Sequence, residues 1–493
     1  DYSLFILNRH RRQLLQGMEV HESIGLANGT SGGAVVFAGS TVLIALIALT
    51  VTGIPFLGVM GIVGAGCVLV AVLIAITMTP ALLGLLGKRV LSRRARARLG
   101  HTHHADTSLK PMGTVRAVVT TLVAIAALLA VAVPALSMRL GLPDGSSEDP
   151  ESTQYATYHT VADKFGAGQN ASLLVVAELP DAVGEDEITA TQADIAGLLM
   201  EQDDVVAVAP AGVNDARDFF AFQIVPSDGP SSVATEELVH SLRAASPLDG
   251  DITLGVAGQA TGNIDVSEKL ADALPLYLGV VVGLSLIILI LVFRSLLVPL
   301  IATAGFVLTI LAAFGGMTAV YQFGFLGGVL GVTDPGPLLS FAPIIVMGVL
   351  FGLAMDYQLF LVSGMREAYV HGVPAREAIT AGLRNGRAVV TAAAIIMISV
   401  FGGFVFSHLS MVRPLGFGLA FGVLIDAFVV RMLLIPAVMH LLGTSAWWLP
   451  KWLDRILPNV HVEGAGLERS HPVHPGVAPE QVHEGVAEPV PTR

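Results

Sequence analysis

The stretch FGLAMDYQLFLVSGMREAYVHG, residues 351–372, decides how this chain folds. Its first half is mainly apolar but contains Asp356, and it lies in the longer run 338–363, which is long enough to cross a membrane. An ionisable side chain at that depth costs about 2.5–3.5 kcal/mol on insertion scales, so such residues usually serve a function. We therefore expect Asp356 to exchange protons inside a membrane helix. A buried acid that only pins a helix interface is the alternative.

The neighbours of Asp356 fit this interpretation. Gly348, Gly352 and Asp356 are spaced by four residues, so they share one helix face. Glycines on such a face let a second helix approach closely. Tyr357 offers a hydroxyl for hydrogen bonding across that interface. Phe360 follows one turn later and either closes the relay from the cytoplasm or simply packs.

The same motif occurs a second time. DYSLFILNRHRRQLLQG at 1–17 matches DYQLFLVSGMREAYVHG at 356–372. Asp1, Tyr2 and Phe5 therefore repeat the Asp-Tyr pair and its phenylalanine. Because two copies at matching positions need one explanation, the duplication favours a functional role for the pair.

The repeat extends beyond the motif. MTPALLGLLG around Pro80 matches LIPAVMHLLG around Pro436, and each copy holds three helices in the same order. Duplicated helix sets are typical of transporters that rock two halves about a central site. By symmetry we expect one span, an outside domain and two more spans before Asp1. The chain is thus expected to be the C-terminal part of a protein with twelve spans and two outside domains.

Composition and hydropathy predict a polytopic α-helical membrane protein. Of 493 residues, 53% are apolar and 13% are charged, whereas a soluble domain carries about a quarter charged residues. Residues 1–8 look like the end of one span. Eight full spans are predicted at 34–54, 57–86, 116–136, 274–293, 296–320, 338–363, 387–407 and 412–442.

Lysine and arginine orient these spans in the plasma membrane. The loop 87–115 is strongly basic, so it is expected in the cytoplasm together with the C-terminal tail, which places 137–272 outside. The predicted parts are 1–86 (end of the first-half bundle), 87–115 (basic loop), 116–136 (first span of the second half), 137–272 (outside domain), 273–443 (five-span bundle), 444–463 (interfacial amphipathic segment) and 464–493 (disordered tail).

The outside segment 137–272 reads as a folded acidic domain, with 24 Asp and Glu against five Lys and Arg. Its pattern is βαβ followed by βαβ, which predicts a ferredoxin-like α+β fold. The predicted strands are 171–178, 204–209, 218–226 and 251–257, and the predicted helices are 187–201 and 232–245. Two further helical segments, 151–165 and 262–272, are expected to join the domain to the membrane.

The last span, 412–442, carries two opposite charges, Asp426 and Arg431. They are five residues apart, roughly on one side of the helix, and charges at membrane depth usually pair. The first copy has Val70 and Ala75 at the aligned positions, so the pair belongs to one half only. A part in the proton path and a structural ion pair both remain open.

Other chemistries lack their motifs. The chain contains no G-x-x-x-x-G-K-S/T loop, and no strand-to-helix turn that would make a nucleophile elbow is predicted. His101, His103 and His104 lack companion cysteines or carboxylates at metal-binding spacing. We expect no cofactor, no metal and no nucleotide or nucleic-acid partner, and a transporter rather than an enzyme.

Together these motifs resemble the MmpL family of the RND transporter superfamily. The resemblance rests on 351–372, on DYSLF at the start, on GLAFGVLIDAFVVRMLLIPAVMHLLG at 418–443 and on WWLPKWLDRILP at 447–458. It implies an RND-type helix bundle of which this chain holds eight full spans and one partial span. It also implies extracytoplasmic porter domains, of which 137–272 would be one.

The resemblance further implies roles for individual residues. The two Asp-Tyr pairs would form the proton relay, the two phenylalanines would line an inhibitor-accessible pocket, and the charged pair of the last span would assist. These residues are Asp1, Tyr2, Asp356 and Tyr357, then Phe5 and Phe360, then Asp426 and Arg431.

The function expected from the sequence is export of a lipid or other lipophilic molecule, driven by the proton-motive force. Drug or antibiotic efflux by the same mechanism is one alternative. A non-transporting membrane protein for lipid sensing or assembly is another. The expected partners are a lipophilic substrate, protons and membrane lipids, and the possibility of a homo-oligomer stays open.

Overall fold

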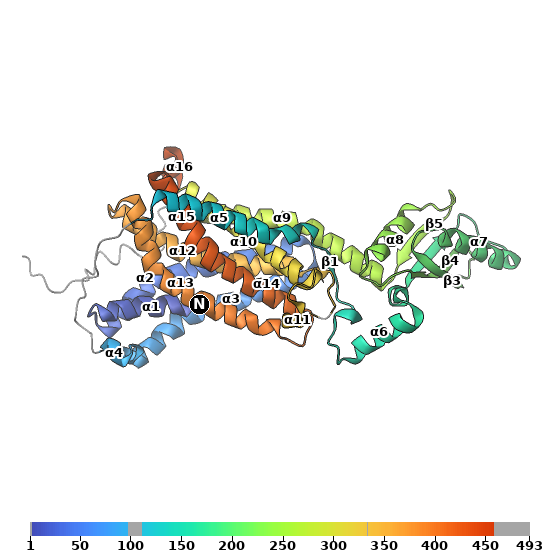
Figure 1. Cartoon of the computed structure of the whole chain (residues 1–493), viewed down its shortest axis with the longest axis horizontal. Coiled ribbons are helices and arrows are strands. Elements are labelled where there is room, and N and C mark those ends of the chain that lie inside the picture. Colours follow the sequence, from blue (N-terminus) through green and yellow to red (C-terminus); the bar gives the residue numbers. More distant parts are fainter. Residues whose placement is uncertain (1, 97–110, 333, 458–493) are drawn as a thin grey trace, which may run out of the picture. The chain divides into compact units, whose positions relative to one another are not determined.

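The computed structural model describes residues 2–96, 111–332 and 334–457 (Figure 1). They form two compact units, the first with residues 2–37 and 70–96, the second with residues 38–69 and 111–457. The expectations for Asp1, for His101, His103 and His104 and for the tail 464–493 lie outside the described residues.

Eight helices of the described chain are long and apolar enough to cross a membrane, the number predicted from hydropathy. Several of these helices are longer than the predicted apolar spans, since polar residues at their ends are also helical. The eight are Val20–Thr52, Pro55–Val90, Thr114–Ser137, Gln259–Phe293, Leu297–Gln322, Ala342–Val370, Gly386–Val405 and Val412–Trp447.

The first unit contains the start of the chain, in blue in Figure 1. Its elements are α1 (Tyr2–Leu15), the first part of α2 (Val20–Ile47), the second part of α3 (Pro55–Leu86), η2 (Gly87–Val90) and α4 (Arg93–Arg96). Hydrogen bonds between side chains join these helices. The hydroxyls of Ser3 and Thr79 are 2.8 Å apart, and the Asn28 amide donates to the Ile76 carbonyl at 3.2 Å.

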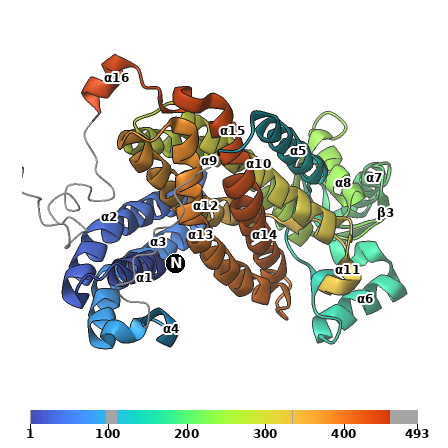
Figure 2. The same cartoon turned by 60° about the vertical axis from the view of Figure 1, so that its left-hand side comes forward.

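The second unit holds the remaining membrane helices. They are η1 (Ala48–Thr52), α5 (Thr114–Ala132) with η3 (Val133–Ser137), α9 (Gln259–Phe293), α10 (Leu297–Met317) with η7 (Thr318–Gln322), α12 (Ala342–Val370), α13 (Ala375–Val405), and α14 (Val412–Leu424) with η8 (Ile425–Leu434) and α15 (Ile435–Leu442). Helices α12, α13 and α14 pack against one another, and α10 packs on α14 (Figure 2). The buried face of α12 is therefore covered on several sides.

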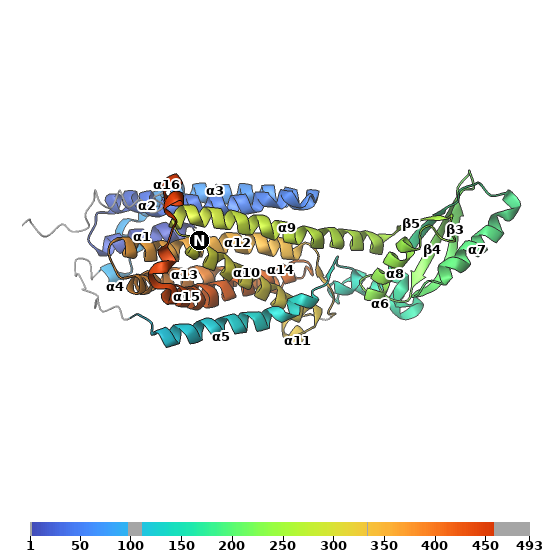
Figure 3. The same cartoon turned by 90° about the horizontal axis from the view of Figure 1, so that it is seen from above.

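One helix links this bundle to the soluble domain. The expected segment 262–272 and the expected span 274–293 form a single 35-residue helix, α9 (Figure 3). Pro275 lies inside it without ending it. Side chains of α9 also hold the helix to α8 (Val233–Ala244) of the domain, since Arg243 binds both carboxylate oxygens of Asp265 at 2.6 and 2.9 Å.

The soluble domain has the predicted ferredoxin-like topology. Its four strands are β2 (Leu173–Glu178), β3 (Val205–Val213), β4 (Phe219–Pro226) and β5 (Thr253–Ala257), in the order β3-β4-β2-β5, with every neighbouring pair antiparallel. Its helices are α7 (Ile188–Met200) and α8. The strands alternate buried and exposed side chains, and Ile195, Leu199 and Leu238 of the helices join the core on one face.

Short elements fasten the domain to the bundle. Strand β1 (Leu140–Gly141), after α5, pairs in parallel with β6 (Leu338–Leu339), just before α12. The helix expected over 151–165 is α6 (Thr153–Phe165). The remaining short helices are η4 (Gly145–Ser147), η5 (Ala167–Ala171), η6 (Glu185–Glu187), α11 (Gly327–Leu330), η9 (Gly443–Trp447) and α16 (Lys451–Ile456).

Candidate functional site: a buried polar network around Asp356

Asp356 lies at the middle of α12 and is only 5% exposed. Tyr357 beside it is 1% exposed. Neither Oδ1 of Asp356 nor the Tyr357 hydroxyl has a hydrogen-bond partner in the described part of the chain. A polar atom buried without a partner costs about 1–3 kcal/mol. The pair is therefore held in an environment that structural packing alone would not favour.

The glycine face of α12 receives a tyrosine from another helix. Tyr277 of α9 is fully buried, and its hydroxyl donates to the carbonyl oxygen of Ala45 in α2 at 3.1 Å. A Cβ atom at Gly348 would lie 2.5 Å from that hydroxyl oxygen. At Gly352, a Cβ atom would lie 2.7 Å from a methyl group of Val42. The predicted close approach at both glycines is confirmed.

Gln358, two residues after Asp356 on α12, belongs to a second set of buried polar side chains. Arg431 donates from Nε to both carboxylate oxygens of Asp426, each at 3.1 Å. Its Nη1 donates to Oε1 of Gln358, and the hydroxyl of Thr309 donates to Oδ1 of Asp426 at 3.3 Å. Asp426 and Arg431 are each 1% exposed. The predicted ion pair thus forms, and it connects the last span to the helix that carries Asp356.

A local change of helix type makes this ion pair possible. In an α-helix, residues five apart point about 140° away from each other. Here residues 425–434 form a π-helix, whose repeat of i to i+5 stacks Asp426 and Arg431 on one side. The expectation that a spacing of five residues places the two side chains roughly on one side of an α-helix is therefore wrong, and their pairing depends on this π-helical segment. Such π segments in membrane helices often mark functional sites.

Several atoms of the network remain without partners. In the described chain these include Nη2 of Arg431 and Nε2 of Gln358, in addition to the atoms of Asp356 and Tyr357. The unpaired N–H groups could donate hydrogen bonds to water. The unpaired oxygen of Asp356 could accept a hydrogen bond from water or take up a proton. Gln358 and Thr309 were not among the sequence candidates. Their signal was a polar side chain in an otherwise apolar span.

The remaining candidates are two phenylalanines and the tyrosine of the first pair. Phe360 is half-buried on α12, next to Gly386 of α13. In the first unit, Tyr2 is half-buried and Phe5 is buried on α1. Asp1 lies outside the described residues, so the described part of the first pair is its tyrosine.

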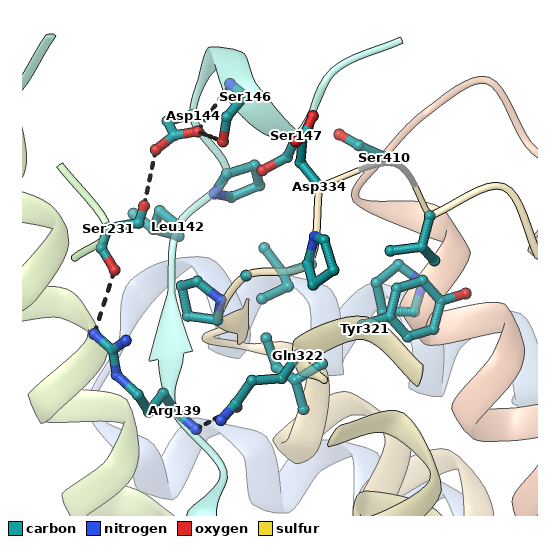
Figure 4. A pocket seen from close by; sticks show the side chains of 18 of the residues that line it. Arg139, Leu142, Asp144, Ser146, Ser147, Ser231, Tyr321, Gln322, Asp334 and Ser410 are labelled. Atoms are coloured by element: carbon teal, nitrogen blue, oxygen red, sulfur yellow. Dashed lines mark hydrogen bonds between the residues drawn. The ribbon is translucent and has the colours of Figure 1, made fainter. Parts of the chain in front are cut away.

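A separate cavity of about 370 Å³ lies where the soluble domain meets the bundle (Figure 4). Asp144 accepts hydrogen bonds from Ser146 and Ser231, and Arg139 pairs with Glu236 at 3.2 Å. Burial, and then the carboxylates of Asp144 and Asp228, raise the pKa of Tyr158 to about 12. These bonds lie within the soluble domain, and Gln322 of the cavity lining joins the bundle to it by accepting from the backbone N–H of Arg139 at 2.8 Å and donating to the Ser137 carbonyl at 2.7 Å.

No cluster of three or more His, Cys, Asp or Glu side chains that could hold a metal ion occurs among the described residues. The buried polar groups of the second unit instead comprise the Asp356 carboxyl with its unpaired Oδ1 and, separately, the ion pair of Asp426 and Arg431 with Gln358 and Thr309. A buried carboxyl with an open oxygen is a group that can gain or lose a proton.

Comparison with known proteins places the chain in a family. The family model described as "MMPL family" matches residues 1–105 and 156–459. The chain is 42% identical over 487 residues to "Membrane protein YdfJ" of Bacillus subtilis, covering 98% of this chain and 66% of that protein. It is 32% identical over 473 residues to "Mycolic acid-containing lipids exporter MmpL11" of Mycolicibacterium smegmatis, covering 94% of this chain and 49% of that protein.

The chain thus spans about half to two thirds of the length of these relatives. Among solved structures, a crystal structure of SecDF in its super-membrane-facing form matches with a TM-score of 0.48 and 12% identity, covering 95% of this chain and 53% of that one. The family match covers most of the chain and agrees with its eight candidate membrane helices. This chain is a multi-pass integral membrane protein and belongs to the MMPL family.

Proposed function

We propose that the protein exports a lipid or other lipophilic molecule across the plasma membrane and draws its energy from the proton gradient. The observation that carries this proposal is Asp356, a buried carboxyl with an unpaired oxygen at the centre of a membrane helix. A proton crossing the membrane yields about 2.3 kcal/mol per 100 mV, and a buried carboxyl that gains and loses a proton can use it.

In this proposal the two Asp-Tyr pairs form the relay. Asp356 and Asp1 take up and release the proton, and Tyr357 and Tyr2 donate or accept hydrogen bonds beside them. Asp426 and Arg431 form an ion pair, so together they add no net charge to the helix bundle that holds Asp356. Phe5 and Phe360 lie one turn further along and limit access from the cytoplasm.

The substrate class rests on family membership and on the relatives. A relative named as an exporter of mycolic acid-containing lipids covers 94% of this chain at 32% identity. Lipophilic cargo is therefore the best-supported class, and efflux of a lipophilic drug or antibiotic would use the same relay. Residues 137–272 would face outward in this arrangement, with the basic loop 87–115 and the C-terminal tail in the cytoplasm, as basic loops generally are.

The decisive experiment replaces Asp356 with Asn in the protein expressed from its own gene. We expect normal membrane levels, loss of export and accumulation of one lipophilic compound inside the cell, measured by comparing lipids of membrane, envelope and medium. Asp163→Asn is the matched control, because Asp163 is exposed on α6 of the soluble domain. Unchanged lipid distribution with normal levels of Asp356→Asn would contradict proton-coupled export and favour a sensing or assembly role.

A further inference from the structure

The first unit contains a buried polar cluster that the proposed relay does not use. His10 and Ser23 are fully buried, and Gln13 is 4% exposed. His10 and Gln13 lie on α1, and Ser23 lies on α2. Three polar side chains in the interior of one helix pair call for an explanation beyond packing, because each must find a hydrogen-bond partner there.

The hydrogen bonds of this cluster fix the tautomer of His10. Its Nδ1 is 2.8 Å from the hydroxyl oxygen of Ser23. That hydroxyl points to two oxygen acceptors, the His10 carbonyl at 3.2 Å and Oε1 of Gln13 at 3.1 Å. Since a hydroxyl has a single proton, Nδ1 must carry a hydrogen and donate it to Ser23. The lone pair of the neutral ring is therefore on Nε2.

This lone pair is available. Nε2 of His10 is buried and has no hydrogen-bond partner within the described chain. Burial lowers the pKa of His10, so the ring is a neutral proton acceptor near pH 7. Among the ionisable side chains of α1, of α2 and of the turn between them, Arg9 is half-buried beside His10 and the others are exposed. The exposed ones are Arg11, Arg12, Glu19, His21 and Glu22.

The cluster lies beyond the relay on the same helix. His10 follows Tyr2 by eight residues, a rise of about 12 Å along α1, and it comes after Phe5. The hydroxyl pair of Ser3 and Thr79 lies on the same face as His10, about two turns earlier. Between Ser3 and His10 this face carries Ile6 and Leu7, so the two polar groups are separate sites along α1.

The second repeat lacks the buried polar cluster of His10, Gln13 and Ser23. The positions that match His10, Gln13 and Ser23 are Met365, Ala368 and Ala378, which are all apolar. Its own buried histidine, His440, lies on α15 and aligns with Gly84 of the first repeat. The polar cluster on the motif-bearing helix therefore belongs to one repeat.

We propose that His10 carries protons between the first Asp-Tyr helix end and the cytoplasm, with Ser23 and Gln13 as positioning residues. This inference rests on the proton-driven function proposed above. A proton taken up at Nε2 forms the imidazolium, and its release restores the neutral ring, so one proton passes without net change in the protein. Proton exit is then asymmetric between the repeats.

The test uses the full protein in liposomes made from the lipids of its own host, with a pH-sensitive dye inside. The quantity measured is the rate of proton flux after a small pH jump, at starting values from about pH 5.5 to about pH 8. We expect His10→Gln to lower the rate at least about tenfold, in line with the typical contribution of a proton-transferring side chain. In the wild type the rate of proton flux should change with pH where His10 titrates. This pH step should disappear in His10→Gln. His21→Gln, which changes an exposed histidine on α2, should leave both unchanged.

Two substitutions beside His10 separate proton transfer from structure. Ser23→Ala removes the acceptor of the Nδ1 hydrogen and should move the pH step to lower pH. Gln13→Glu adds a carboxylate that stabilises the imidazolium and should move it to higher pH. If the His10→Gln protein fails to accumulate in the membrane, the opposite shifts of the pH step in Ser23→Ala and Gln13→Glu test the role of His10 instead. A wild-type profile for all three variants would overturn the inference.

Asp356→Asn in the same liposomes keeps the two proposals apart. Loss of flux in Asp356→Asn with normal flux in His10→Gln overturns the role of His10 alone. Normal flux in Asp356→Asn overturns proton-coupled export, and the role of His10 falls with it. Loss of flux in both, with the pH step absent in His10→Gln and shifted in its neighbours, supports both.

Discussion

The last helix of the first repeat and that of the second repeat differ where they would be expected to match. In the first, α3 is an uninterrupted α-helix over Pro55–Leu86, with Val70 and Ala75 at the relevant positions. In the second, the same stretch is broken by a ten-residue π-helix that pairs Asp426 with Arg431. Burying two charges five residues apart requires this change in helix type, whereas apolar side chains do not.

The two repeats also differ in which of their helices carry buried polar groups. The first has the His10 cluster on α1 and α2, and the second has Asp426, Arg431 and Gln358 on η8 and α12. A duplicated helix set has thus diversified its polar chemistry. This division is what one expects when two halves share a scaffold but perform different steps of one cycle.

The largest effect should come from breaking the ion pair of the second repeat. Arg431→Ala leaves Asp426 buried without its counter-charge, which should lower the free energy of unfolding by about 3–5 kcal/mol. Thermal unfolding in detergent measures this loss. Adding Asp426→Val, which gives the second repeat the residues of the first, should recover a large part of it. A double variant as unstable as Arg431→Ala would show that the pair is not the source of the loss.

A smaller effect is expected where α2 of the first repeat meets α9 and α12 of the second. Gly348→Ala places a methyl group against the Tyr277 hydroxyl and should cost about 1–3 kcal/mol. Tyr277→Phe removes the bond to Ala45 and should cost about 1 kcal/mol.

The double variant Tyr277→Phe with Gly348→Ala sharpens this test. It should be more stable than the sum of the two losses predicts, because phenylalanine lacks the oxygen that the new methyl group would meet. Unfolding temperatures of the four proteins provide the measurement. Strict additivity would contradict the contact.

The smallest effect should come from an arginine–aspartate pair that is exposed to water. Arg243 and Asp265 form a bidentate pair with side chains 35% and 49% exposed. Arg243→Ala should therefore change stability by less than about 1 kcal/mol, and salt should reduce the difference further. Unfolding at low and high salt measures both. A loss as large as that of Arg431→Ala would contradict the role of burial in this comparison.

Much of the soluble domain could be predicted from sequence because its signals are local. The strands expected at 171–178 and 218–226 are β2 and β4, and the helix expected at 187–201 is α7. Alternation of apolar residues and the turns between elements determine these segments without reference to distant contacts. The continuous α9 was harder to foresee, since the change from polar to apolar composition near residue 273 suggests two elements although the backbone stays helical.

The candidate site divides in the same way. Asp356, Tyr357, Asp426 and Arg431 stand out in the sequence, because a charge or a repeated motif in an apolar span is costly and easily seen. Gln358 and Thr309 became part of the network only through their contacts with Arg431 and Asp426. A neutral polar side chain in a span is common enough that its partner must be known before its role is clear.

The sequence by itself determined the spans, the repeat and the buried acids, since length, hydropathy and duplication are properties of the chain alone. Only the tertiary structure decided which polar atoms meet and which stay unpaired. The π-helix that aligns Asp426 with Arg431, the hydroxyl of Tyr277 at Gly348 and the hydrogen bonds of His10 are visible only in the folded chain. The physical reason is that a hydrogen bond requires its two atoms within about 3 Å, a condition that only the packing of helices can meet.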